Sequence, residues 1–233
     1  IITSTIGEHA YTYKIIDMCK AQKIPLVVYG NHPAVSECDR VYTDHMRGSK
    51  EITEWLISKG CRKILPFFPL QPSKNWEKMR IQGYTEAMTA AGLEVRECAW
   101  HGIKDVPETP LDAEFNIGRA LVFEKLFELQ RKNDFDAIVC QTDHFAKIVI
   151  SALRQLGFIP NKDVLVAGYD NVMPDLTYDP FESEYSIVTI DKRNDKIANE
   201  MAKLLVERIS GDLPDEPQCR TNSHELVVRD QSV

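Results

Sequence analysis

Short apolar runs alternate with longer amphipathic stretches along most of the chain. The runs are rich in β-branched residues and lack polar alternation, which is typical of strands buried on both faces of a parallel sheet. We predict strands over 24–30, 40–44, 63–68, 94–100, 136–140, 164–170, 186–191 and 226–230. Apolar side chains recur at helical spacing between them, which predicts helices over 8–22, 48–59, 75–91, 112–132, 143–156 and 192–210. The predicted fold class is therefore α/β, with doubly wound parallel sheets built from right-handed βαβ units.

Length and composition are those of a soluble globular protein. The chain has 233 residues, 43% of them hydrophobic and 27% charged, which suits one large domain or two small ones. It has no apolar run of about 18 residues and no secretion leader, so we expect a cytoplasmic protein. The six cysteines are scattered singly without a CxxC pair, which favours reduced thiols over disulfides or a zinc site.

The charge balance argues against direct contact with nucleic acid. The chain carries 35 acidic and 28 basic side chains, for a formal net charge of -7. Such a surface repels phosphate, so this chain by itself is not expected to bind DNA or an anionic membrane.

The ends of the predicted strands hold the first candidate site residues, because doubly wound folds bind ligands beyond the carboxyl ends of their strands. These residues are Asp44, Trp100, Thr142, Asp143 and Asp170. The sequence has no GxGxxG, GxxxxGK[ST], GxSxG or HExxH motif, so dehydrogenases, P-loop enzymes, hydrolases and metalloproteases lack support. We expect a binding protein that is not an enzyme and that needs no cofactor or metal.

Several segments, in order and spacing, resemble one family. They are IPLVVYG, VYTDHMRG and WLISKGCRKI, then RxxGYxxAxxxxG from Arg80 to Gly92, DAI to ALRQLG over 136–157, PNKDVLVAGYD over 160–170, and the closing ELVVRDQS. Together they resemble the effector domain of lactose-repressor (LacI/GalR) transcription regulators, which shares its fold with periplasmic sugar-binding proteins. The likeness covers nearly the whole chain. One departure is Cys61, which stands where the family motif has histidine.

The resemblance implies two lobes joined by three crossing strands, with the ligand between them. The expected first lobe comprises residues 1–64 and 192–218, and the second comprises 65–191 and 219–233. The family normally begins with two further strand–helix units, a helix-turn-helix domain and a hinge helix, and none of these is in this sequence. The first lobe is thus expected to be incomplete, and operator DNA to be bound only through an N-terminal domain absent from this chain.

The resemblance also assigns ligand contacts. Arg80 matches an arginine whose planar fork bonds two ligand oxygens at once, although helix pattern alone favours a solvated arginine. Asp170 matches the acid of the GYD motif, which accepts hydrogen bonds from ligand hydroxyls, and otherwise reads as a turn residue. Trp100 matches a ring that packs on the ligand's apolar face, with a core position as the alternative. Asp143 is expected to cap the helix that starts at residue 144, which leaves Thr142 as the better pocket candidate.

Three further residues are weaker candidates. Trp76 lies one turn before Arg80 and is a second possible stacking ring. Arg47 stands where the lactose-repressor pattern has a cleft-facing acid, which points to a different or acidic ligand, and a solvated arginine is an equal alternative. Asp44 is expected to fix the strand-to-helix turn rather than to touch ligand.

The helix near 143–156 predicts a homodimer. Eight of the twelve residues between Phe145 and Leu156 are apolar, and they cover more of the helix surface than one sheet needs. Ile148 or Ile150 must therefore border something else, either a neighbouring helix of the same lobe or a second copy of the chain. The family pairs this region and the segment around Tyr178 across a two-fold axis, so we expect Ile150 and Tyr178 in the dimer interface.

These observations lead to one expected function and two alternatives. The expected function is ligand sensing in a bacterial transcription regulator, where a sugar or sugar derivative changes operator affinity. The first alternative is an extracytoplasmic solute-binding protein that feeds a transporter. The second is a sugar-modifying enzyme that uses Asp170 or His101, and it requires turnover of the ligand.

Overall fold

The computed structural model describes residues 1–4, 10–97, 110–130, 134–172 and 180–229. The chain divides into two compact units. Unit 1 comprises Ile1–Asp44 and Lys192–Glu225, and unit 2 comprises His45–Asp191 and Leu226–Val233. The chain therefore crosses between the units at three places, after Asp44, Asp191 and Glu225. In the part of the chain that is described, no helix is long and apolar enough to span a membrane.

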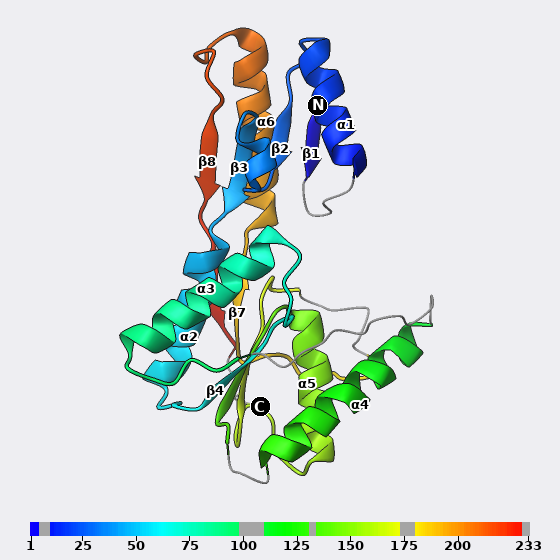
Figure 1. Cartoon of the computed structure of the whole chain (residues 1–233), viewed down its shortest axis with the longest axis vertical. Helices are drawn as coiled ribbons and strands as arrows, with labels where there is room; N and C mark the ends of the chain where they lie inside the picture. Colours follow the sequence, from blue (N-terminus) through cyan, green and yellow to red (C-terminus); the bar gives the residue numbers. More distant parts are fainter. Residues whose placement is uncertain (5–9, 98–109, 131–133, 173–179, 230–233) are drawn as a thin grey trace. The chain divides into compact units, whose positions relative to one another are not determined.

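Unit 1 is a parallel sheet with a helix on each face. Its strands lie in the order β1-β2-β3-β8, and they are β1 Ile2–Ser4, β2 Val27–Tyr29, β3 Asp39–Thr43 and β8 Cys219–Asn222. Its helices are α1 Ala10–Ala21, the short 3-10 helix η1 Pro33–Val35 and α6 Asn194–Ser210. The layers are visible in Figure 1, where α6 and α1 flank the strands.

Neighbouring residues of β2 build the two small cores of unit 1, because successive side chains of a strand point to opposite faces. Val28 packs with Ile16 of α1 and with Val35. Val27 packs instead with Met201 and Leu204 of α6. A continuous apolar strand is therefore what a sheet covered on both sides requires, as the sequence pattern predicts.

Unit 2 is a larger sheet with two helices on each face. The strands lie in the order β4-β5-β6-β7-β9, and they are β4 Ile64–Phe67, β5 Ala137–Cys140, β6 Leu165–Ala167, β7 Val188–Asp191 and β9 Glu225–Val228. The helices are α2 His45–Ser58, α3 Asn75–Ala90, α4 Leu111–Gln130 and α5 Asp143–Gln155. Helices α2 and α3 share one apolar cluster with the sheet, and α4 and α5 share another (Figure 1). The predicted α/β fold with doubly wound parallel sheets is confirmed.

Helices α2 and α3 cross so closely that glycine is required between them. A Cβ on Gly83 of α3 would lie 2.1 Å from the carbonyl oxygen of Met46 and 2.9 Å from the amide nitrogen of Lys50. Both contacts are to the backbone of α2, which cannot move aside as a side chain can. This crossing fixes the first turn of α2 beside α3, where Arg80 lies.

The structure corrects two of the predicted lobe boundaries. Helix α2 was expected in the first lobe, but its buried Ile52 and Leu56 pack with Tyr84 and Met88 of α3, so the helix belongs to unit 2. Residues 219–222 were expected in the second lobe, but they form β8, which pairs in parallel with β3 of unit 1. Of the strand predicted over 94–100, residues 94–97 are not a strand, and the rest lies outside the described residues.

Ile150, which was expected in the dimer interface, lies instead in the core of unit 2. Ile150 is fully buried and Ile148 is 4% exposed, because α4 packs against α5 and both isoleucines join the core of unit 2. Lys147 of α5 is also fully buried, although its side chain is charged. Its ammonium donates to the carbonyl oxygen of Glu182 at 2.8 Å and lies 3.7 Å from the ring centre of Tyr185. A neighbouring helix therefore covers the wide apolar surface of α5.

Candidate ligand-binding site

The guanidinium of Arg80 is the centre of the candidate site in unit 2. It projects from α3 and is 2% exposed. One terminal nitrogen donates to the carbonyl oxygen of Gln141, which follows β5. The other donates to Oδ1 of Asp170 at 3.0 Å and lies 3.4 Å from Nδ1 of His45. Three segments far apart in the sequence thus meet at one side chain.

Aromatic rings enclose the same guanidinium. Its carbon atom lies 3.5 Å from the ring centre of Tyr169 and 4.5 Å from that of Trp76. The ring of His45 lies 5.6 Å from Tyr169 and 6.4 Å from Trp76, measured between ring centres. Planar rings on a desolvated guanidinium stabilise its charge and restrict its rotation. Among the described residues, Nε of Arg80 is buried and has no hydrogen-bond partner.

Asp170 follows the end of β6 in an uncommon backbone conformation. Its φ is 95°, in the left-handed region that residues other than glycine rarely adopt. The backbone N–H donates to the carbonyl oxygen of Ile190 at 2.9 Å, which continues the link between β6 and β7 past the last strand residue. The side chain is 19% exposed, so Asp170 combines a bond to Arg80 with access from solvent.

Thr142, and not Asp143, caps helix α5. Thr142 is the N-cap of α5, since its Oγ1 accepts a hydrogen bond from the amide of Phe145 at 3.2 Å. Asp143 is the first residue of the helix and is 2% exposed. Both residue types favour caps, so local preference alone does not choose between them.

Asp143 is instead the buried centre of a polar network. Its carboxylate accepts hydrogen bonds from Oγ of Ser186 at 2.6 Å and from Oγ1 of Thr189 at 2.8 Å, and Arg229 lies 3.5 Å away. Burial raises the pKa of the Asp143 carboxyl, while Arg229 and the hydroxyl donors act in the opposite direction. A Cβ on Gly168 would lie 1.9 Å from Oδ1 of Asp143, so the strand end must carry glycine there. The network anchors α5, β7 and the end of β6 beside Asp170.

The three weaker candidates for the site, which are Arg47, Asp44 and Trp76, do not share one environment. Arg47 has a side chain that is 71% exposed and donates to Glu51 at 2.8 Å, one turn further along α2. Asp44 is half-buried and follows β3 at the end of the first segment of unit 1. Trp76 is half-buried and is joined to Arg80 by the ring contact described above. Trp100 and Tyr178 lie outside the described residues.

Three members of the cluster were not among the predicted site residues: His45, Gln141 and Tyr169. Signals for them exist in the motifs, since His45 and Tyr169 belong to TDHMRG and GYD, and Gln141 follows the apolar strand DAIVC. Their roles depend on packing against Arg80, which no local pattern specifies.

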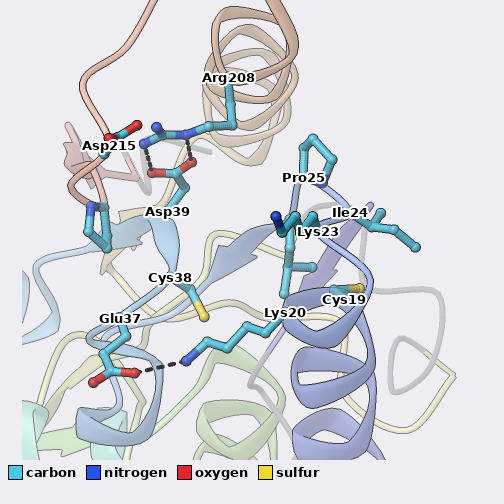
Figure 2. A pocket seen from close by; sticks show the side chains of 12 residues that line it. Cys19, Lys20, Lys23, Ile24, Pro25, Glu37, Cys38, Asp39, Arg208 and Asp215 are labelled. Carbon is cyan, nitrogen blue, oxygen red and sulfur yellow. Dashed lines mark hydrogen bonds and ion pairs between the residues drawn. The ribbon is translucent and has the colours of Figure 1, made fainter. Parts of the chain in front are cut away.

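Each unit also has a cavity away from Arg80. The cavity of unit 1 has a volume of about 210 Å³ and lies beside the first residues of β2 and β3 (Figure 2). Lys20 and Glu37 form an ion pair at 2.9 Å on one side of it, and Arg208 holds the carboxylate of Asp39 with two hydrogen bonds on the other. The cavity of unit 2 has a volume of about 300 Å³ and is lined mainly by apolar residues, such as Phe68. Parallel sheets usually bind ligands at the opposite ends of their strands, so the cavity of unit 1 is the less favoured site.

Comparison with known families shows to which family the chain belongs. The sequence pattern of the periplasmic binding protein-like domain family matches residues 53–232. The chain belongs to this family. Arg80, Asp170, Tyr169 and Trp76 therefore lie within the matched residues, whereas His45 precedes them.

Relatives of this periplasmic binding protein-like domain confirm the resemblance to LacI-type regulators. The chain is 28% identical over 221 residues to the HTH-type transcriptional repressor PurR of Actinobacillus pleuropneumoniae serotype 3 (strain JL03), and the match covers 94% of the chain and 60% of that protein. A LacI-type transcription regulator from Bifidobacterium animalis subsp. lactis DSM 10140 is 26% identical with a TM-score of 0.70, over 97% of this chain and 76% of that one. A transcriptional regulator CelR–cellobiose complex shares the fold, with a TM-score of 0.74 and 24% identity over 98% of this chain and 64% of the other. The chain thus spans less than two thirds of the length of the curated repressor that it matches.

Proposed function

We propose that this chain is the effector-sensing part of a bacterial, cytoplasmic transcription regulator. In this proposal a small polar effector, a sugar or sugar derivative, binds between the two lobes and stabilises one relative orientation of them. The altered orientation changes how a homodimer presents its DNA-binding domains to operator DNA. The observation that carries the proposal is the Arg80–Asp170 pair, which joins the two motif residues that the family resemblance assigns to the ligand.

The surroundings of the pair suit a hydroxyl-rich ligand. The carboxylate of Asp170 is partly exposed and accepts hydrogen bonds from hydroxyl groups. Arg80 orients that carboxylate, and a ligand oxygen that reached its buried Nε would satisfy a donor that has no partner among the described residues. Trp76 supplies an aromatic face beside the pair, and Trp100 is proposed as the ring that stacks on the sugar.

A transcription regulator is favoured over the solute-binding alternative by the relatives, which are named as transcription regulators. The same relatives favour a binding protein over the sugar-modifying alternative. The cellobiose complex of the structural neighbour makes cellobiose the first sugar to test, followed by ribose, glucose and galactose.

The test is a binding series on the purified chain. A sugar at about 100 times its dissociation constant should stabilise the wild type by about 2.7 kcal/mol in thermal unfolding. Arg80→Lys removes the planar fork and should weaken binding by about 1 to 3 kcal/mol, measured by titration calorimetry. Asp170→Asn should weaken it similarly, since an amide replaces one of the acceptor oxygens with a donor.

The matched control is Arg119→Lys on α4, where the arginine bonds only Asn116 one turn away among its described contacts. This variant should bind the sugar as the wild type does. Unchanged affinity in both Arg80→Lys and Asp170→Asn would remove the pair from the ligand site, and conversion of the sugar into a product would establish the enzyme alternative.

A further inference from the structure

Two consecutive residues at the end of β6 adopt left-handed backbone conformations. Asp170 has a φ of 95° and Asn171 a φ of 50°, and neither is glycine. Such residues persist only where surrounding contacts hold them, and they cluster at functional sites. Asparagine tolerates this region better than most residue types. The contacts of Asn171 therefore hold the turn in place.

Asn171 is bonded through its backbone and through both ends of its side-chain amide. The backbone N–H donates to Oγ1 of Thr189 at 3.3 Å. The amide nitrogen donates to Oδ2 of Asp191 at 3.2 Å, and the amide oxygen accepts from Nη2 of Arg229 at 3.0 Å. A single side chain thus joins the turn that carries Asp170 to β7 and to the segment after β9.

The partners of Asn171 lie next to two of the three crossing points. Asp191 is the last residue of unit 2 before the chain passes to unit 1. Arg229 comes shortly after the chain returns to unit 2 at Leu226. On the unit 1 side, the amide of Asn222 donates to the carbonyl oxygen of Lys192 at 2.6 Å, so the same two crossing segments are tied there as well.

Two of the residues that bond Asn171, Thr189 and Arg229, make further hydrogen bonds within unit 2. Thr189 also donates to the buried carboxylate of Asp143. Arg229 donates to the carbonyl oxygen of Ser186 at 2.9 Å and to its Oγ at 2.6 Å. A change in the position of the Asp170 turn therefore reaches the crossing segments through bonded groups rather than through solvent.

We infer that Asn171 is a positioning residue that holds Asp170 in its ligand-facing turn and couples this turn to the segments on which the chain crosses between its units. The ligand part of this inference rests on the proposed function, whereas the coupling within unit 2 does not. Asn171 acts through its bonds to Asp191 and Arg229 and not by touching the effector.

The first test needs no ligand. Hydrogen exchange is measured on the whole chain for peptides that cover 166–172 and 186–193, in the wild type, Asn171→Ala and Asn171→Gly. Losing the side-chain bonds to two charged groups should raise exchange of the 186–193 peptide by about tenfold in both variants. Glycine permits the left-handed conformation but has no side-chain amide, so Asn171→Gly removes the hydrogen bonds to Asp191 and Arg229 and keeps the backbone conformation. The same variant can be used if Asn171→Ala does not fold.

The matched control is Asn116→Ala, which removes an exposed amide that bonds Arg119 on α4. It should leave both peptides unchanged. Wild-type exchange of the 186–193 peptide in Asn171→Gly would overturn the inference, because the turn would then be independent of the crossing segment.

The second test uses cellobiose, with ribose, glucose and galactose as the further probes. In the wild type a bound sugar should slow exchange in both peptides. In Asn171→Gly it should protect 166–172 alone and bind about tenfold more weakly. Equal protection of 186–193 in the variant and the wild type would overturn the inference. If no sugar binds the wild type, the proposed function fails, and the ligand-free exchange still decides whether Asn171 couples the turn to the crossing segment.

Discussion

Arg80 shows how much of a binding site a single residue can organise. Its buried charge is balanced by Asp170, its donors are directed to a carbonyl oxygen and a histidine nitrogen, and its faces are covered by Tyr169 and Trp76. A lysine has no planar face and no second terminal nitrogen, so it cannot reproduce this arrangement. The effect expected for Arg80→Lys follows from this geometry and not from charge, which the substitution preserves.

A second prediction at the scale of residues concerns Cys61, where the family motif has histidine. The thiol is 6% exposed, and burial, with the nearby Asp136 carboxylate as a smaller cause, raises its pKa to about 11. At pH 8 its thiolate fraction should be about 100-fold lower than that of an ordinary thiol with a pKa near 9. Alkylation of the native protein followed by peptide mass spectrometry should therefore label the exposed Cys219 much faster than Cys61.

The direction in which stability changes with pH follows from the raised pKa of Cys61. Below pH 9 the Cys61 thiol is neutral in both the folded and the unfolded chain, so the burial of this thiol contributes fully to the free energy of unfolding. As the pH rises from about 9 towards 11, the unfolded thiol ionises first, and this contribution is lost. Equal labelling of Cys61 and Cys219 at pH 8 would contradict the assignment.

At the scale of elements, the crossing of α2 and α3 determines where Arg80 and His45 meet. His45 begins α2 and Arg80 lies in the middle of α3, so their contact depends on the close approach at Gly83. Gly48 makes a similar approach elsewhere on α2, where a Cβ would lie 2.4 Å from the hydroxyl oxygen of Tyr169. Two glycines therefore bring α2 against both the neighbouring helix and a ring of the site.

Gly83→Ala tests this crossing. Alanine improves helix propensity by about 1 kcal/mol, but its Cβ would meet the α2 backbone, and overpacking of this kind costs about 1 to 3 kcal/mol. Because neither clashing atom belongs to a flexible side chain, we expect the free energy of unfolding in urea to fall. The control is Thr89→Ala, an exposed position on the same helix that should be neutral or slightly stabilising. A Gly83→Ala protein as stable as the wild type would show that the helices can separate without cost.

At the scale of the whole molecule, the proposed homodimer rests on the family resemblance and on the segment around Tyr178, because Ile150 is enclosed in unit 2. Substitutions at Ile150 and at Tyr178 should therefore act differently. Ile150→Glu places a charge in a dry core and should lower the free energy of unfolding by more than about 4 kcal/mol. Tyr178→Asp should leave the chain folded and shift it from dimer to monomer.

Sedimentation velocity at micromolar concentration, combined with circular dichroism, distinguishes the two effects. Thr89→Glu, a charge at an exposed position of α3, is the control and should sediment as the wild type does. A wild-type chain that sediments as a monomer would contradict the dimer. A Tyr178→Asp protein that remains a dimer would place the interface on another surface.

The sequence by itself determined the elements and the fold class. The apolar runs and helical spacing predicted α2 to α6 within a few residues of their observed bounds, because strand and helix preference depend on neighbours a few positions away. Strand β8 was missed, since its residues Cys-Arg-Thr-Asn are polar and its pairing with β3 is a contact between distant parts of the chain. The motifs also indicated Arg80 and Asp170 as partners in one site, through resemblance and not through local pattern.

Only the tertiary structure decided which surface each element buries. The apolar width of α5 was visible in the sequence, but only the packing of α4 shows that Ile150 faces its own unit. Thr142 and Asp143 are both good cap residues, and the choice was made by Ser186, Thr189 and Arg229, which bond the carboxylate. Asp170 and Arg80 are 90 positions apart, and their bond exists because the chain that follows strand β6 lies beside the first half of helix α3. Contacts of this kind depend on the position of whole elements, which short-range preference does not encode.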